Sequence, residues 1–222
     1  MFSKIIWFLV VVFILGLSAC GTPEIDEVRK TTCFIYTDGL LDDLCAIEYL
    51  SDKYESAVIL LQDPGGLAGN EYASDIVSNK KAFMDTVSGW FSVVTEYSDS
   101  EDLSNMDIYL LAPLTEFASL LEENSSLKSN HALMMAGDSD GPNGAGLEWN
   151  ATADEEAYRY VTENMTDLTQ IAAPECEAAY LQTGYSFSAA FLDEYVHQME
   201  SMNENVCCYD LQAVSYMFEY QP

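Results

Sequence analysis

Three aspartates lie within six residues of one another, where an apolar stretch changes into an amphipathic one. Asp38 directly follows the apolar run 33–37, and Asp42 and Asp43 open a stretch with helical spacing. Carboxylates this close raise one another's pKa unless a cation lies among them, and such hard oxygen ligands suit Ca²⁺ or Mg²⁺. The alternative that these residues leave open is an acidic loop before a helix whose dipole favours the charges.

The chain around these aspartates alternates short apolar runs with longer amphipathic ones. Runs of strand length occupy residues 33–37, 57–62, 108–111, 133–136 and 168–172. Helical spacing occupies residues 42–51, 72–87, 114–122 and 154–162, with Thr115 or Asp154 placed to cap a helix. This alternation predicts an α/β fold with an open, mostly parallel sheet flanked by helices.

The pattern changes after Pro174, where the helical segments 176–183, 188–199 and 211–218 predict a helical C-terminal part. The chain has 222 residues and shows no internal repeat, which suits a single domain over residues 31–222. Open α/β sheets bind ligands at the carboxyl ends of their strands, where Asp38 is expected.

The first residues have the features of an export signal. Lys4 precedes an apolar run over residues 5–17, which is short for a membrane span and suits a signal peptide. Residues 17–21, Leu-Ser-Ala-Cys-Gly, resemble the lipobox of bacterial lipoproteins. That resemblance implies a signal peptide over residues 1–19, acylation of Cys20 and a lipidated tether over residues 20–30. The expected location is outside the cytoplasm, periplasmic or on the cell surface, with the membrane contacted through the lipid only; an ordinary cleaved signal is the alternative.

The charge balance excludes one class of partner. The chain carries 37 Asp and Glu against 8 Lys and Arg, for a formal net charge of -29, which repels phosphate backbones and anionic lipid headgroups. We therefore expect a small-molecule partner and no nucleic acid, and the oligomeric state is left open. Five cysteines besides Cys20 permit a disulfide in an oxidising compartment, without determining its pairing.

Two families place acids of this kind after a first strand. Thr37-Asp38-Gly39 resembles part of the DxDG pattern of haloacid-dehalogenase-type phosphatases, but Tyr36 stands where their attacking aspartate would be. Residues 36–43, Tyr-Thr-Asp-Gly-Leu-Leu-Asp-Asp, resemble the D-x-D-P-G-x-D-D signature of the nucleoside hydrolase family at its second, third and fourth acids. They depart from it at the first acid and at the Pro-Gly pair.

Further segments resemble the nucleoside hydrolase family in the same order along the chain. Gly69-Asn70 with Asn79 is similar to its GN and downstream Asn, and residues 111–116 are similar to its GPLTN turn. Residues 135–137, 148–157 and 209–214 are similar to its MGG, EFN-x-x-x-DPEA and HDPLAV segments. Because these segments are collinear, the chain resembles a shortened nucleoside hydrolase of the inosine/uridine-preferring kind.

The resemblance implies a Ca²⁺-dependent glycosidase that hydrolyses the N-glycosidic bond of ribonucleosides, or of a related N-riboside, by a metal-bound water. The Ca²⁺ ligands that it implies are the side chains of Asp38, Asp43 and Asp210 and the backbone carbonyl of Leu111. Asp38 would also be the catalytic general base. The substrate-binding residues that it implies are Asp42, Asn70, Asn143, Glu148 and Asn150. On local grounds, Asp210 fits a helix N-cap equally well.

The chain departs from the family where a leaving nucleobase would be recognised and protonated. Material is missing after the third predicted strand and between Pro174 and Asp210, and Tyr209 stands where family members often have histidine. His131 and His197 are expected to be structural, so no leaving-group acid is assigned. The alternative function is therefore a catalytically inactive surface lipoprotein of the same fold that binds Ca²⁺ and a ribosyl group.

Overall fold

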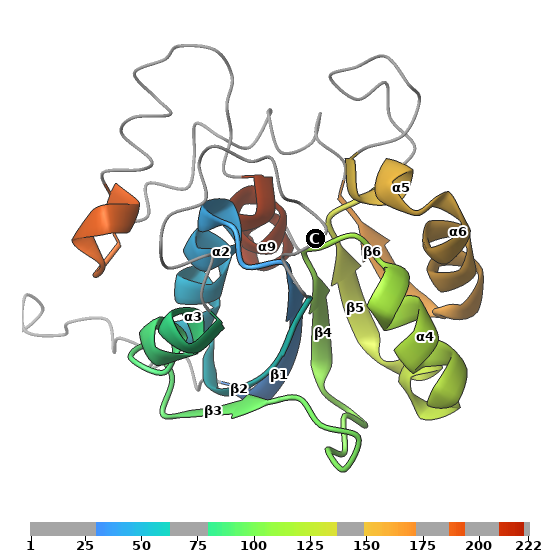
Figure 1. The fold of residues 1–222 in the computed structure, drawn as a ribbon, viewed down its shortest axis with the longest axis horizontal. Coiled ribbons are helices and arrows are strands. Elements are labelled where there is room, and N and C mark those ends of the chain that lie inside the picture. Colours follow the sequence, from blue (N-terminus) through green and yellow to red (C-terminus); the bar gives the residue numbers. More distant parts are fainter. Residues whose placement is uncertain (1–29, 63–79, 137–148, 172–186, 194–208, 220–222) are drawn as a thin grey trace, which may run out of the picture.

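The computed structural model describes residues 30–62, 80–136, 149–171, 187–193 and 209–219, in which strands alternate with helices as predicted (Figure 1). The strands are β1 (Lys30–Thr37), β2 (Tyr54–Leu61), β3 (Val93–Glu96), β4 (Asp107–Leu110), β5 (His131–Met134) and β6 (Asp167–Gln170). The helices are α2 (Leu41–Ser51), α3 (Lys80–Val87), α4 (Thr115–Glu123), the 3-10 turn η2 (Ser125–Ser129), α5 (Trp149–Ala153), α6 (Glu155–Asn164) and α9 (Tyr209–Glu219).

The strands form one open sheet in the order β3-β2-β1-β4-β5-β6, and every described pairing is parallel. This confirms the predicted parallel α/β sheet. The chain moves outward from β1 to β3 and then returns to β4 on the other side of β1. The strand order therefore reverses between β1 and β4, which is the place where open α/β sheets bind ligands beyond the carboxyl ends of their strands.

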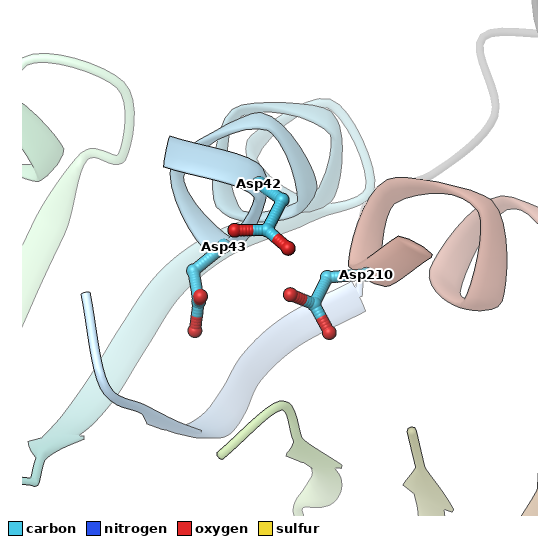
Figure 2. A group of neighbouring side chains, drawn as sticks. All are labelled: Asp42, Asp43 and Asp210. Carbon is cyan, nitrogen blue, oxygen red and sulfur yellow. The ribbon is translucent and has the colours of Figure 1, made fainter. Parts of the chain in front are cut away.

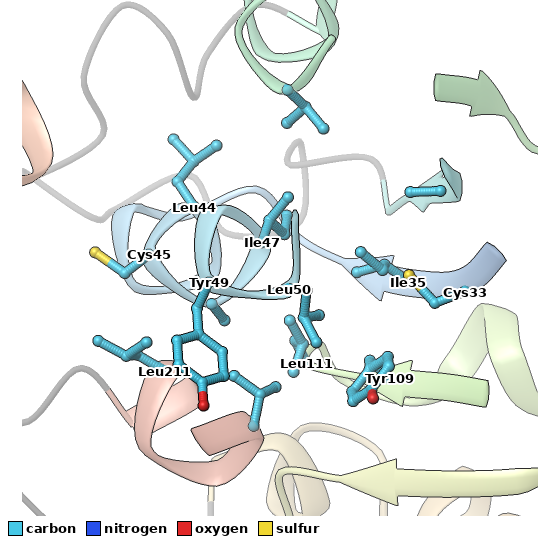
Figure 3. Packing of buried hydrophobic residues seen from close by; sticks show 14 of the residues in the cluster. Cys33, Ile35, Leu44, Cys45, Ile47, Tyr49, Leu50, Tyr109, Leu111 and Leu211 are labelled. Carbon is cyan, nitrogen blue, oxygen red and sulfur yellow. The ribbon is translucent and has the colours of Figure 1, made fainter. Parts of the chain in front are cut away.

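Helices cover both faces of the sheet, and β1 is buried between them. Successive strand residues point to opposite faces. Cys33 and Ile35 pack with α2, α3 and α9 (Figure 3), whereas Phe34 and Tyr36 pack with α4 and α6. The two apolar layers hold β1 rigidly in the middle of the molecule, so the residues that follow it start from a constrained position.

Helix α9 joins the first of these layers by packing beside α2 (Figure 1). The rings of Tyr49 on α2 and Phe218 on α9 lie with their centroids 6.1 Å apart. The ammonium of Lys53 lies 5.5 Å from the centroid of each ring, which adds cation–π attraction to the apolar contact. Because α9 packs along α2, its first turn, with Asp210, lies beside the first turn of α2 at the carboxyl end of β1.

The structure corrects several details of the predicted elements. Strand β3 was not predicted, because it is a four-residue edge strand with partly exposed side chains and no alternating pattern. The short helix α5 was also missed. Strand β2 begins three residues before the predicted 57–62, at Tyr54. Of the two candidate caps, Asp154 caps α6 by accepting a hydrogen bond from the Ala157 N–H.

Some predictions fall outside the described residues. They concern Cys20 and the signal peptide, Asn70, Asn143, Glu148, the first half of the predicted helix 72–87, the helix 176–183 and the second half of the helix 188–199. The buried Cys33 and Cys45 form no disulfide, and the other cysteines lie outside these ranges. Within the described residues, no helix is both long enough and apolar enough to cross a bilayer.

Candidate metal centre

The turn between β1 and α2 positions three of the acids. Asp38 directly follows β1, and Gly39 has a φ of 78°, a conformation that side chains disfavour. A Cβ on Gly39 would also lie only 2.9 Å from Leu61 Cδ1. The sharp turn lets α2 begin at once, so Asp42 and Asp43 fall in its first turn, where the helix dipole favours carboxylates.

A fourth acid comes from the other end of the chain. Asp210 lies in the first turn of α9, so it is a helix residue and not an N-cap. One carboxylate oxygen each from Asp42, Asp43 and Asp210 lie within 4.8 Å of one another, at the point where α9 meets α2 (Figure 2). Asp43 and Asp210 are buried and Asp42 is half-buried. We call these three residues the acidic cluster.

Asp38 lies beside the acidic cluster and is buried, with an exposed fraction of 4%. Burial and the negative charge of Asp42 raise its pKa to about 6, although hydrogen bonds with Asp43 and from the Leu40 N–H, at 3.3 Å, oppose the rise. This pKa is close to neutral pH. A carboxyl group with such a pKa can exchange protons readily under physiological conditions.

Asp43 lies at the centre of the four acids. Its pKa is raised well above its ordinary value by burial and then by the negative charges of Asp38, Asp210 and Asp42. The Thr37 hydroxyl donates a hydrogen bond to Asp43 Oδ1, which offsets part of this effect. The pKa of Asp42 is also raised by burial, against the backbone N–H groups of α2 and a hydrogen bond with Asp210.

No basic side chain among the described residues contributes to lowering these pKa values. The negative charges of Asp38, Asp42 and Asp43 are therefore not balanced by a basic side chain of the described residues. Carboxylate oxygens alone, buried and mutually repulsive, form a donor set that suits a hard divalent cation. The acidic cluster is thus a candidate metal centre at the place where the fold predicts a ligand.

The end of β4 lies against the same site and is held by Tyr36. The Leu111 N–H donates to the Tyr36 carbonyl at 2.9 Å, and the Tyr36 hydroxyl donates to the Pro113 carbonyl at 2.7 Å. Gln62 Oε1 lies 3.2 Å from the same hydroxyl. Burial raises the pKa of Tyr36, so this phenol stays protonated. Tyr36 therefore ties together the carboxyl ends of β1, β2 and β4, a role that an aspartate at this position would not fill.

Asn150 on α5 reaches the same edge of the sheet. Its Nδ2 donates hydrogen bonds to the carbonyls of Leu111, at 3.2 Å, and Met135, at 2.9 Å. The Leu111 carbonyl, which the resemblance assigned to Ca²⁺, therefore accepts a hydrogen bond and retains one further lone pair. Within the described residues the Oδ1 of Asn150 accepts no hydrogen bond, so it could serve a ligand.

The structure thus brings together most of the site residues that it describes. Asp43 and Asp210 lie in the acidic cluster, as does Asp42, which the resemblance assigned to the ribose. Asp38 touches the cluster through Asp43. The sequence analysis did not identify Thr37, whose hydroxyl orients the Asp43 carboxylate. Thr37 could have been found from its position, because it directly precedes Asp38 and lies on the face of β1 that α2 covers.

Comparisons with models of known protein families and with curated proteins found no match. The fold and the site therefore define only a broad class, an open parallel α/β protein with a candidate cation site where its strand order reverses. This class is common to proteins of many functions, because function resides in the site and not in the fold.

Proposed function

We propose that the protein is an exported, Ca²⁺-dependent hydrolase of the N-glycosidic bond of ribonucleosides or of a related N-riboside. The observation that carries this proposal is the acidic cluster, with carboxylate oxygens within 4.8 Å of one another at the reversal of the strand order. The collinear segments that resemble nucleoside hydrolases supply the choice of reaction. The lipobox-like residues 17–21 supply the choice of location.

The cation would be held by Asp42, Asp43 and Asp210, with Asp38 beside them. When bound, Ca²⁺ supplies positive charge that acidifies and orients a water molecule. Its charge also relieves the repulsion among the four carboxylates, which, after burial, raises the pKa of Asp38 and of Asp43. The lone pair that remains on the Leu111 carbonyl makes this oxygen a further candidate ligand.

Asp38 is the general base in this mechanism. Its carboxylate is buried beside the acidic cluster, where it is placed to accept a proton from the attacking water. As the bond to the leaving group breaks, positive charge develops on the sugar ring. The net negative charge of the acidic cluster stabilises that charge at short range, because burial removes the screening water.

Two partly exposed groups are suited to hold the ribosyl hydroxyls. Asp42 is half-buried, so an outer lone pair of its carboxylate can accept from a hydroxyl. Asn150 Oδ1 is another acceptor, because the amide nitrogen of this side chain is already directed to the carbonyls of Leu111 and Met135. Asn70, Asn143 and Glu148 remain proposals from the sequence.

The proposal is tested by calorimetric titration of Ca²⁺ into EDTA-stripped mature protein, followed by assays of ribose release from inosine and uridine. The wild type is compared with Asp43→Asn, which removes the central charge, and with Asp38→Asn, which removes the base. Asp85→Asn is the matched control, because Asp85 is exposed and pairs with Lys81 on α3. We expect one tight site in the wild type and the control, an affinity lower by roughly two orders of magnitude in Asp43→Asn, and no ribose release from Asp38→Asn.

Weak binding at several sites, unchanged by Asp43→Asn, would contradict the metal centre. Tight binding with unchanged turnover in Asp38→Asn would contradict the role of the base and leave the metal centre intact.

One observation favours a second candidate function, a Ca²⁺- and ribosyl-binding module without turnover. The described residues contain one histidine, His131. It lies next to Asp107, at the end of the sheet opposite to the acidic cluster. The described part of the site therefore contains no imidazole to protonate a leaving nucleobase. Tight Ca²⁺ and ribose binding without ribose release would establish this module in place of the enzyme.

A further inference from the structure

We propose that the membrane anchor holds the domain by the amino edge of its sheet, so that the candidate metal centre opens away from the bilayer and takes water-soluble substrates. The amino edge is the side at which β1, β2, β4 and β5 begin. This inference rests on the lipid anchor in the proposed function. It concerns how the anchored domain presents its site, which neither the fold nor the motif states.

The predicted tether enters the domain at the amino edge. Lys30 is the first residue of β1, and its backbone N–H donates to the Lys53 carbonyl at 2.9 Å. The Lys30 ammonium also donates to Asp107 Oδ2 at 2.6 Å and lies 5.7 Å from the ring centroid of Tyr54. These contacts hold the point of entry against β2 and β4.

The candidate metal centre lies at the other end of the same strand. β1 spans Lys30–Thr37, and Asp38 follows directly. At about 3.3 Å per residue, the strand separates the point of entry from the site by roughly 23 Å. Because residues 33–37 of β1 are buried, most of this separation is rigid. The predicted tether, residues 20–30, therefore joins the domain at the end of β1 that is remote from the site.

Electrostatic repulsion between the protein and an anionic bilayer favours the same orientation. The chain has a formal net charge of -29, and the acidic cluster concentrates buried negative charge at the carboxyl edge. Anionic headgroups therefore repel the carboxyl edge, whereas at the amino edge Lys30 and Lys53 offset part of the charge of Asp52, Glu55 and Asp107. A substrate carried by a lipid could not reach the site in this orientation, whereas a dissolved riboside could.

Two tryptophans provide natural probes of this orientation. Trp7 lies in the predicted signal peptide, which leaves Trp90 and Trp149 in the mature chain. Trp90 lies just before β3, at the amino edge. Two residues later, the Ser92 N–H donates to the Glu55 carbonyl near the start of β2. Trp149 begins α5 beside Asn150, which contacts the carboxyl ends of β4 and β5, and Trp149 is 65% exposed.

The test is energy transfer from tryptophan to a dansyl-labelled headgroup in vesicles that carry the full acylated protein, purified from membranes. Trp149→Phe reports Trp90 alone, and Trp90→Phe reports Trp149 alone. We expect transfer from Trp90 to be at least about twice as efficient as transfer from Trp149, because transfer falls steeply with distance. If Trp90→Phe fails to fold, the difference between wild type and Trp149→Phe gives the Trp149 contribution.

Equal transfer from the two positions, or stronger transfer from Trp149, would overturn the orientation. Mass spectrometry of the same preparation tests the premise, and a Cys20 without acyl groups would overturn the orientation together with the anchor. Neither result bears on the metal centre, because the Ca²⁺ titration uses the soluble mature domain. Failure of this inference is therefore distinguishable from failure of the proposed enzyme.

Discussion

Carboxylates at the two edges of the sheet have opposite electrostatic surroundings. At the amino edge, Asp107 accepts hydrogen bonds from the Lys30 ammonium at 2.6 Å and from the Tyr54 hydroxyl at 2.5 Å, and His131 Nδ1 lies 3.3 Å away. At the carboxyl edge, Asp43 is surrounded by Asp38, Asp42 and Asp210. The same type of side chain is compensated by the protein at one edge and left uncompensated at the other.

The pKa values of the carboxyl groups at the two edges are shifted in opposite directions. Burial by itself would raise the pKa of Asp107, but hydrogen bonds from Lys30 and Tyr54 and the charge of Lys30 hold it below its ordinary value. Burial and like charges raise the pKa of Asp38 and Asp43 instead. The difference indicates that the carboxylate at the amino edge stabilises the fold, whereas the carboxyl edge carries a candidate cation site.

The largest expected effect is on the pH dependence of stability in EDTA-stripped protein. The pKa of Asp38 rises from its ordinary 3.8 to about 6 in the folded state, so the folded protein binds more protons between these values. Stability from this group is present below the unfolded pKa and is lost as pH rises through about 6, by on the order of 3 kcal/mol. Urea unfolding from about pH 4 to pH 7 measures this loss.

Saturating Ca²⁺ should remove the decline with pH, because bound Ca²⁺ keeps the carboxylates ionised. A flat profile in the stripped protein, or the same decline with and without Ca²⁺, would contradict the contrast between the two edges.

The second effect is that the same substitution, Asp to Asn, should change the free energy of unfolding in opposite directions at the two edges. In stripped protein near neutral pH, Asp43→Asn should stabilise the fold by about 1 to 2 kcal/mol, because it removes a buried charge among like charges. Asp107→Asn should destabilise it by about 1 to 3 kcal/mol, because the Lys30 and Tyr54 donors lose a charged acceptor. Chemical denaturation of both variants measures the two changes.

Asp85→Asn serves as the exposed reference and should lie within about 0.5 kcal/mol of the wild type. Destabilisation by Asp43→Asn as large as that by Asp107→Asn would mean that both edges are structural.

A smaller effect is expected at the turn that builds the carboxyl edge. Gly39→Ala places a Cβ at a φ of 78° and within 2.9 Å of Leu61 Cδ1, so it should cost about 1 to 2 kcal/mol. The strained turn should also displace Asp38 relative to Asp42 and weaken Ca²⁺ binding. Thermal unfolding and calorimetry measure the two effects, and unchanged Ca²⁺ affinity would mean that the turn does not position the site.

The smallest effect is expected for Tyr36→Phe, which leaves the Pro113 carbonyl without its donor and should cost about 1 kcal/mol. The backbone bond from Leu111 to Tyr36 remains, so Ca²⁺ affinity should hardly change. Tyr109→Phe, which removes the 2.7 Å contact between the Tyr109 and Tyr54 hydroxyls at the amino edge, is the matched control. A large loss of Ca²⁺ affinity in Tyr36→Phe alone would assign Tyr36 to the metal centre.

The sequence predicted the architecture well where the local pattern is strong. The apolar runs at β1, β4 and β5 and the cap at Asp154 were recognisable because strand length, alternation and helix capping are local properties. Strand β3 was not recognisable, because an edge strand is buried on few sides and needs no continuous apolar run. Helix α5 was missed because its five residues are too few to show periodicity.

The candidate site was predictable in part for the same reason. Asp38, Asp42 and Asp43 lie in one short stretch, so chain geometry alone places them together. The hydrogen bonds of Asn150 to Leu111 and Met135 were not predictable, because they join α5 to the ends of two strands through long-range packing. The role of Tyr36 could not be predicted from the sequence, which showed only that a tyrosine stands where the nucleoside hydrolase signature has its first aspartate.

The sequence by itself determined the strand–turn–helix unit that carries three aspartates, because neighbouring residues cannot separate by more than the chain allows. It also determined the parallel α/β class through the alternation of apolar patterns. Only the tertiary structure decided that Asp210 completes the acidic cluster and is not simply a helix cap. That choice depends on the packing of α9 against α2, and apolar packing between distant segments leaves no local pattern in the sequence.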